Sequence, residues 1–128
     1  TARYGILMLD INNLKKINDA YGHDYGDEYL LTCCQMICKV FQHSPVYRIG
    51  GDEFLVLLEN ADYENRDSLI AEFNRHSEAS LQEANVWQQV SVAKGLAVYE
   101  ASDTSPEDVL RRADHAMYQN KKEMKVTR

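Results

Sequence analysis

The chain has 128 residues, with 14 lysines and arginines against 20 aspartates and glutamates, which gives a formal net charge of −6. This length fits one domain with a single core, residues 1–128. The acidic balance argues against nucleic acid or an anionic membrane surface as the main partner. The sequence has no apolar run of membrane-spanning length and no signal-peptide pattern, so we expect a cytoplasmic domain without direct membrane contact.

The three cysteines, Cys33, Cys34 and Cys38, fall in one predicted helix. Their number is odd and their spacing matches no common zinc pattern. We therefore expect reduced, mostly buried thiols, as is usual in a cytoplasmic protein. The four histidines are scattered along the chain, which argues against a histidine-based metal site.

Hydrophobic periodicity predicts the elements in the order β-α-α-β-β-α-β-α. They are expected over residues 4–10, 12–20, 25–42, a hairpin at 46–58, 63–84, 90–99 and from Pro106 onward. Along residues 90–99, larger side chains alternate with small ones, which predicts a strand on which a helix packs closely. Helices and sheet together predict an α/β (α+β) sandwich.

Carboxylates occur at two places where apolar β segments end. Asp10 follows an apolar strand, and Asp52 and Glu53 follow Gly50-Gly51 between two β segments. Adjacent glycines there predict a tight hairpin. Three carboxylates brought together in this way suit a hard divalent cation, which in proteins mostly serves phosphate chemistry. The alternative is a strand-end cap beside ordinary polar hairpin residues.

Three segments carry a family resemblance. Residues 50–54, Gly-Gly-Asp-Glu-Phe, match the signature of the GGDEF family of diguanylate cyclases, residues 10–27 resemble its second motif, and residues 113–121 its third. The resemblance covers nearly the whole chain. It implies a palm-like nucleotidyl cyclase fold with a mainly antiparallel central sheet flanked by helices and the hairpin in the middle. The implied activity condenses two GTP into cyclic di-GMP and releases two pyrophosphates.

The resemblance also implies the metal and catalytic residues. Asp10 and Asp52 would bind the metal together with the main-chain carbonyl of Ile11. Glu53 would be a further ligand or would help to deprotonate the attacking 3′-hydroxyl, two roles that the sequence does not separate. The implied cofactor is two Mg²⁺ (or Mn²⁺) ions in each site.

The helix that starts after Asp10 suits phosphate binding, because a helix N-terminus presents free N–H groups and a positive dipole end. Asn13, Leu14 and Lys15 are the expected contacts. The alternative is that Lys15 and Lys16 form a solvated face, and the motif favours the phosphate role for Lys15 only.

Two polar residues match the guanine-reading positions of the family, Asn18 and Asp27. A carboxylate accepts from both N1–H and the 2-amino group of guanine, a donor pair that adenine lacks, and an amide reads the O6 and N7 side. The alternatives are a polar residue near a helix end for Asn18 and a helix N-cap for Asp27.

Lys121 and Lys125 lie one turn apart at the end of the last helix. By resemblance Lys121 holds the γ-phosphate, and Lys125 stands where the family usually has Arg, which keeps the charge but loses bidentate geometry. The alternative is that both lysines complement the negative end of the helix.

The chain departs from the family pattern at three places. Asn12 replaces a frequent Asp, which removes one negative charge near the metals. Residues 41–44, Phe-Gln-His-Ser, lack the Arg and Asp of the usual product-inhibition site. The opening helix of the family would precede Thr1, so we expect a domain excised from a longer protein, with a sensory region upstream and possible membrane attachment of the parent.

Two functions remain open. The first is an enzyme in which two domains face each other as a homodimer, each holding one GTP. The second is a catalytically weak or inactive GTP-binding module that regulates a larger signalling protein. The retained motifs favour the enzyme, whereas Asn12, Lys125 and the missing opening segment keep the second function open.

Overall fold

The computed structural model describes residues 3–126 and contains four strands, five α-helices and one 3₁₀ helix in that range. In chain order they are β1 (Tyr4–Ile11), α1 (Leu14–Tyr21), α2 (His23–Val40), β2 (Val46–Arg48), β3 (Glu53–Glu59), α3 (Asn60–Glu64), α4 (Arg66–Ser80), η1 (Val86–Gln88), β4 (Val92–Val98) and α5 (Pro106–Val126). No helix within residues 3–126 is both long and apolar enough to cross a membrane.

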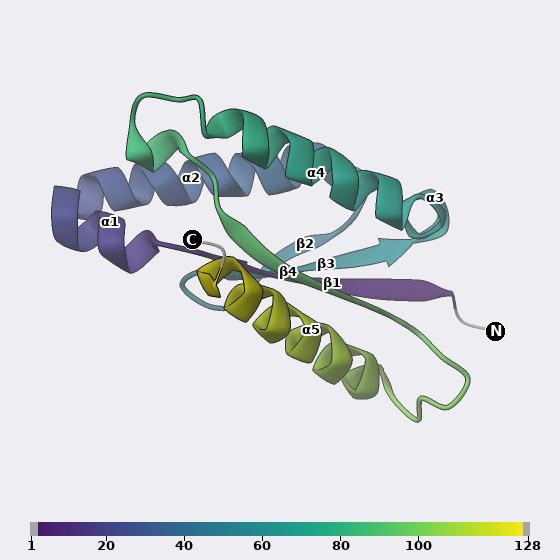
Figure 1. Cartoon of the computed structure of the whole chain (residues 1–128). Coiled ribbons are helices and arrows are strands. Elements are labelled where there is room, and N and C mark those ends of the chain that lie inside the picture. The colour runs from purple at the N-terminus through teal and green to yellow at the C-terminus, as the bar shows by residue number, and fades with distance from the viewer. Residues whose placement is uncertain (1–2, 127–128) are drawn as a thin grey trace.

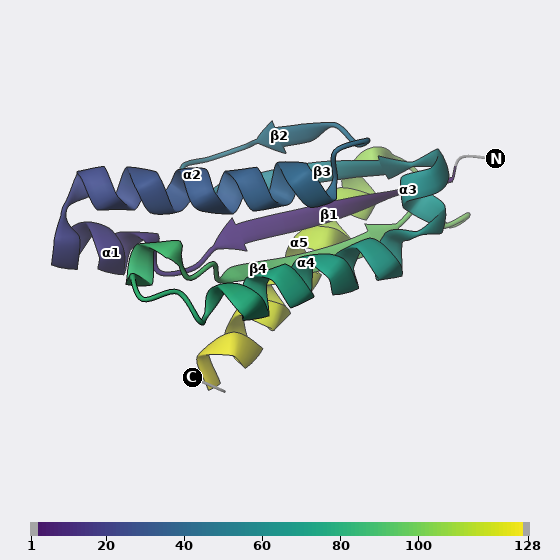
Figure 2. The same cartoon turned by 90° about the horizontal axis from the view of Figure 1, so that it is seen from above.

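The strands form one antiparallel sheet in the order β2-β3-β1-β4. Helices α2 and α4 cover one face of this sheet and α5 covers the other (Figures 1 and 2). This confirms the antiparallel sheet flanked by helices. The expected central position of the hairpin is wrong, because β3 is interior but β2 is a three-residue edge strand.

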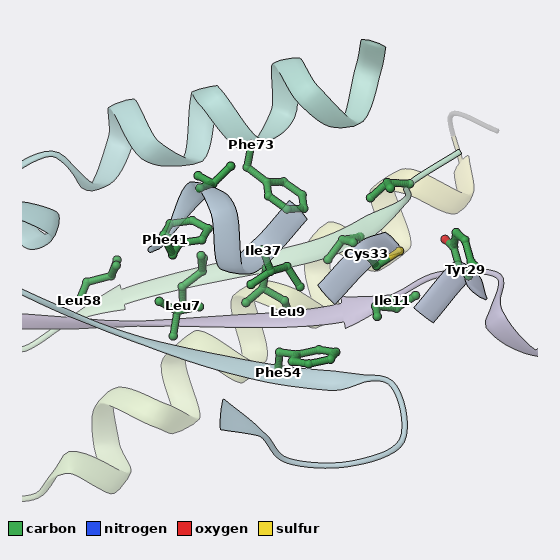
Figure 3. Packing of buried hydrophobic residues seen from close by; sticks show 14 of the residues in the cluster. Leu7, Leu9, Ile11, Tyr29, Cys33, Ile37, Phe41, Phe54, Leu58 and Phe73 are labelled. Atoms are coloured by element: carbon green, nitrogen blue, oxygen red, sulfur yellow. The ribbon is translucent and has the colours of Figure 1, made fainter. Parts of the chain in front are cut away.

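Alternate side chains of β1 supply two separate hydrophobic clusters. Leu7, Leu9 and Ile11 pack with buried residues of α2 and α4, as Figure 3 shows, whereas Ile6 and Met8 pack with α5. Burial of one such side chain contributes about 1.5–3 kcal/mol. The side chain of Asp10 follows the same alternation and therefore lies on the α5 face.

The expected close approach of a helix to the last strand is confirmed at Gly95. A Cβ atom placed on Gly95 would lie 2.1 Å from the main-chain nitrogen of Met117 and 2.3 Å from the carbonyl oxygen of Ala113. Both neighbours are backbone atoms of α5, so only glycine allows this contact. The close packing fixes α5, and every side chain it carries, relative to the sheet.

The single helix expected over residues 63–84 is wrong in its bounds and continuity. It is broken at Asn65, whose side-chain amide donates to the carbonyl of Ala61 at 2.9 Å and whose main-chain N–H also bonds to Ala61. These bonds cap α3 and start α4 in a new direction. Helix α4 ends at Ser80, where the hydroxyl accepts from the N–H of Val90 at 2.9 Å.

The cysteines are all free, as expected, but they are not mostly buried. Cys33 is buried, Cys34 is partly exposed and Cys38 is exposed. Burial raises the pKa of Cys33 to about 12, so this thiol stays protonated at neutral pH. The apolar face of α2 is therefore narrower than the spacing of its cysteines indicates.

Candidate active site

The centre of the site is a pair of carboxylates on neighbouring strands. Asp10 of β1 and Glu53 of β3 are direct partners in the sheet register. Direct partners project to the same face of a sheet, so both carboxylates face α5. Asp10 is only 6% exposed and Glu53 is partly exposed. Sheet pairing thus fixes the separation of these two groups with no contribution from a loop.

Asp10 has one satisfied and one unsatisfied oxygen. The Nζ of Lys121 on α5 lies 2.6 Å from Oδ2, whereas Oδ1 is buried without a hydrogen-bond partner. A buried carboxylate oxygen left unpaired costs more than about 1 kcal/mol. The donor set therefore suits a cation or a hydrogen-bond donor that binds beside Asp10. The sequence did not predict this ion pair between residues 111 positions apart.

The electrostatic environment of Glu53 also favours a cation at this site. Burial is the largest cause that raises its pKa, followed by the negative charges of Asp10 and Asp114, while Lys121 opposes the shift. Asp114 was not among the predicted site residues. It lies seven positions before Lys121, which places both on one face of α5, so helical spacing was the available signal.

Two grooves flank Lys121. The first has a volume of about 630 Å³, and we call it the metal-side groove because it holds the predicted metal ligands Asp10 and Glu53. Its other lining residues are Arg111, Asp114, His115, Met117, Tyr118, Lys121, Lys122 and Lys125. The phosphate-side groove, of about 700 Å³, is lined by Ile11, Asn12, Asn13, Leu14, Lys15, Lys16, Asp52, Lys121, Met124 and Lys125. The fold thus gathers most of the predicted site residues around the end of α5.

The three predicted carboxylates are not gathered equally. Asp10 and Glu53 share one groove, whereas Asp52 lines the other. Among residues 3–126, no group of three or more His, Cys, Asp or Glu side chains is close enough to hold a metal ion. The carbonyl of Asp52 accepts from the N–H of Ile11 at 2.8 Å, which ties the hairpin to the end of β1.

The hairpin spans four residues between β2 and β3, which is longer than the tight turn expected. Neither Gly50 nor Gly51 has a positive φ, and a Cβ atom on either would meet nothing closer than 4.0 Å. The chain itself therefore does not require these glycines. Bare backbone at an open tip suits close approach of a ligand. The guanidinium of Arg48 holds the tip by donating to the carbonyls of Gly50 at 3.1 Å and Gly51 at 2.6 Å.

The turn from β1 into α1 is held by a hydrogen bond from α2. Asn13 adopts a left-handed conformation, φ 71°, directly before the helix, and Asn tolerates this conformation better than most residues. The hydroxyl of Tyr29 donates to the carbonyl of Asn12 at 2.6 Å. The first N–H groups of α1 have no partner within the helix, so they are available to a ligand in the phosphate-side groove.

Asn12 forms structural hydrogen bonds of its own. Its amide donates to the Oγ of Ser91 at 3.1 Å and to the Sδ of Met124 at 3.3 Å. It therefore joins β1 to the segment before β4 and to the end of α5. Lys15, in contrast, forms only an exposed 2.9 Å ion pair with Asp19, and its side chain is 89% exposed. Both alternatives for Lys15 remain compatible with this position.

The two predicted base readers lie apart from the phosphate-side groove. Asp27 is exposed and lines a third groove of about 460 Å³, which we call the base groove because Asp27 is a predicted guanine reader. Its other lining residues are Leu30, Leu31, Cys34, Cys38, Val46, Arg48 and Phe54. Asn18 packs against Gly26, where a Cβ atom would lie 1.6 Å from its Oδ1. This Oδ1 is buried without a partner, so Asn18 also carries an unused acceptor.

Paired carboxylates on an antiparallel sheet lie here beside a glycine hairpin and an open helix N-terminus, an arrangement that suits a phosphate-bearing ligand. Comparison with known proteins identifies the family. The family model described as "Diguanylate cyclase, GGDEF domain" matches residues 1–127. The chain belongs to the GGDEF domain family.

Relatives with assigned names differ in function. The chain is 31% identical over 122 residues to the probable diguanylate cyclase DgcT of Escherichia coli, and 32% identical over 117 residues to the cyclic di-GMP phosphodiesterase PdeR of the same species. These matches cover 92% and 91% of the chain but only 27% and 18% of the relatives. The chain thus corresponds to a minor part of each of these proteins.

Solved structures share the fold. The active GGEEF domain of a diguanylate cyclase from Vibrio cholerae superposes with a TM-score of 0.79 at 29% identity, over 94% of this chain and 78% of that one. A GGDEF domain from Pseudomonas aeruginosa gives a TM-score of 0.80 at 30% identity, over 94% and 72%. The α/β fold with a four-stranded antiparallel sheet is the GGDEF cyclase fold.

Proposed function

We propose that this domain is a diguanylate cyclase. It binds GTP at Lys121 and the N-terminus of α1 and joins two GTP into cyclic di-GMP with release of two pyrophosphates. The observation that carries this proposal is the Asp10–Glu53 pair, held in register on neighbouring strands, with a buried Asp10 oxygen that has no partner.

The carboxylate chemistry of the site fits a divalent metal, which Asp10, Glu53, Asp52 and the carbonyl of Ile11 would hold. When bound, two Mg²⁺ or Mn²⁺ ions would polarise the α-phosphate and neutralise charge on the leaving pyrophosphate. Glu53 would be a further metal ligand or would help to deprotonate the 3′-hydroxyl, since its carboxylate lies beside Asp10 in the sheet register.

The remaining residues would bind and orient the nucleotide. Lys121 lines both grooves, so its ammonium can bind a phosphate oxygen beside Asp10. Asn13, Leu14, Lys15 and Lys125 line the phosphate-side groove and would hold the β- and γ-phosphates. Asp27 and Asn18 would select guanine over adenine. The exposed carboxylate of Asp27 would accept from N1–H and the 2-amino group of guanine, and the amide of Asn18 would donate to the O6 and N7 side.

Catalysis would need a second copy of the domain. One site holds one nucleotide, and the product joins two guanylates by two phosphodiester bonds, so each α-phosphate must meet a 3′-hydroxyl carried by another domain. The net charge of −6 and the bound GTP both oppose this meeting. A dimerising segment elsewhere in a parent protein, such as a sensory region, would raise the effective concentration.

The test is incubation with GTP and Mg²⁺ at rising protein concentration, with products separated by chromatography. We expect cyclic di-GMP and a specific activity that rises with protein concentration, and more so in a fusion to a parallel coiled coil placed before residue 1. Constant specific activity from nanomolar to high micromolar protein, with only monomer in light scattering, would rule out this mechanism.

A regulatory GTP-binding module is the second candidate. Two observations favour it: Asn12 is committed to Ser91 and Met124, and one relative is named a cyclic di-GMP phosphodiesterase. Calorimetry combined with product chromatography on the fused dimer separates the candidates, since the module would bind GTP without forming cyclic di-GMP.

A further inference from the structure

Two cysteines of α2, Cys34 and Cys38, have no role in the proposed reaction. They lie at positions i and i+4, so their side chains share one face of the helix. Both are free, and Cys38 is exposed while Cys34 is partly exposed. Both residues line the same groove, so the two thiol side chains are neighbours on this face. They therefore form a dithiol that is open to solvent.

This dithiol lines the base groove. Asp27, which we propose as a guanine reader, lies in the same groove of about 460 Å³. Val46 and Phe54 form the wall contributed by the hairpin. A group attached to both sulfur atoms would occupy space between α2 and the hairpin, so it would compete with a base that enters the same groove.

The protonation state of the thiols indicates which ligands they suit. Burial raises the pKa of Cys38, and the neighbouring Cys34 raises it further. A peroxide-sensing cysteine needs the opposite, a lowered pKa and a stable thiolate. A thiophilic ion displaces the thiol protons as it binds, so it has no such requirement.

We propose that Cys34 and Cys38 form a chelating site for a thiophilic metal or metalloid ion that takes two thiolates, either trivalent arsenic or Cu(I), and that an ion held there closes the base groove to a nucleotide. The first part is independent of the proposed function. The second part rests on it, because it requires a base in that groove.

The chemistry balances without an oxidant. A monosubstituted arsenical, R–As=O, forms two As–S bonds, its arsenic–oxygen bond and both S–H bonds break, and the oxygen leaves with the two protons as water. Arsenic stays trivalent. Cu(I) forms two Cu–S bonds while both thiol protons pass to solvent, and copper stays Cu(I).

The reduced domain is mixed with one equivalent of phenylarsine oxide or of Cu(I), and native mass spectrometry records the adduct. We expect a 1:1 adduct that withstands excess monothiol but is removed by a dithiol reagent. Cys34→Ser and Cys38→Ser should each weaken binding at least about tenfold, since two ligands become one. An arsenical adduct alone, or a copper adduct alone, assigns the ion, and the absence of both overturns the proposal.

Two control variants separate chelation from reaction at any thiol. Cys33→Ala removes the buried neighbour and should keep the adduct. The double variant Cys38→Ser with Lys39→Cys keeps three thiols but moves one of them to the next position of α2. This variant should not form the adduct. An adduct that survives this relocation, or that needs Cys33, would overturn the assignment to Cys34 and Cys38.

The second part is measured on the same samples by calorimetry with GTP. We expect the loaded domain to bind GTP at least about tenfold more weakly than the free domain, because the groove is filled. Unchanged GTP affinity in the loaded domain overturns the closure alone. If the free domain binds no GTP, the proposed function and the closure both fail, while the adduct result still decides the dithiol site.

Discussion

The strands and the helices supply two unlike halves of the site. The strand half, Asp10 and Glu53, is set by sheet register and lies on the sheet face that α5 covers. The helix half, represented by Lys15, Asp27 and Lys125, is exposed and has few contacts. The carboxylate pair is therefore preorganised by the core, whereas the side chains that we propose for nucleotide binding are free to adjust. Changes in the two halves should therefore differ in kind.

The largest effect is expected at Glu53 of the strand half and at the neighbouring hairpin residue Asp52. Asp52→Asn combined with Glu53→Gln should lower cyclic di-GMP formation by at least about 100-fold, because phosphoryl transfer needs the carboxylates to hold the metal. The melting temperature should stay within a few degrees, since both side chains are partly exposed on the hairpin. Chromatographic assay and thermal melting measure the two effects. Full activity would disprove the metal assignment, and a collapsed melting temperature would show a structural pair.

The next effect tests the helix half through base choice. Asp27→Ala should remove most of a preference for GTP over ATP, about 5- to 150-fold, since a lost hydrogen bond to a carboxylate costs about 1–3 kcal/mol. Stability should hardly change, because Asp27 is exposed. Calorimetry with both nucleotides provides the measurement. Equal GTP and ATP affinity in the unmutated domain would remove Asp27 from this role.

A third prediction concerns the core that supports the strand half. Burial lowers the pKa of Lys94 to about 8 from 10.5, and its Nζ lies 3.1 Å from the carbonyl of Val92 and 5.1 Å from the centre of the Phe73 ring. Between pH 8 and 10.5 the unfolded chain binds more protons at this residue than the folded domain. The contribution of Lys94 to stability therefore rises with pH in that window.

Lys94→Met should remove this rise and increase the free energy of unfolding at pH 7 by about 1–3 kcal/mol, because a charged amine no longer has to be buried. Urea denaturation at pH 7 and pH 9.5 measures both effects. Lys39→Met, on the exposed side of α2, is the matched control and should change neither. Equal pH dependence in Lys94→Met and the unmutated domain would contradict the lowered pKa.

The smallest effect separates two neighbouring lysines of the helix half. Lys15→Ala should weaken GTP binding by roughly threefold to tenfold, while Lys16→Ala should change it less, although both line the phosphate-side groove. The exposed Lys15–Asp19 pair contributes less than about 0.5 kcal/mol, so neither change should alter stability measurably. Equal losses in the two variants would show that only general positive charge matters.

We expect no product inhibition through residues 41–44, and the contacts of two of these residues support this prediction. Phe41 is fully buried and its ring stacks on that of Phe73, with centroids 6.5 Å apart. The hydroxyl of Ser44 hydrogen-bonds to Asp62. Neither residue presents a cation to an anionic nucleotide.

Sequence patterns alone predict the class of elements, the small face of β4, the start of α5 at Pro106, and the motifs that identify the family. These features are local, because periodicity, glycine spacing and helix-start signals act over a few residues. The sequence also placed Asp10 at a strand end and Asp52 with Glu53 at a hairpin.

Which of these groups lie close together depends on tertiary packing. The Asp10–Glu53 register, the Lys121–Asp10 ion pair and the nearness of Asp114 to Glu53 join distant segments. Such contacts depend on how strands align and how closely α5 approaches Gly95, and both are set by packing of the whole core. The edge position of β2 has the same origin, since contacts across the fold override local propensity. The break at Asn65 is instead local, because the side chain and the main-chain N–H of Asn65 both bond to Ala61, which hydrophobic periodicity does not reveal.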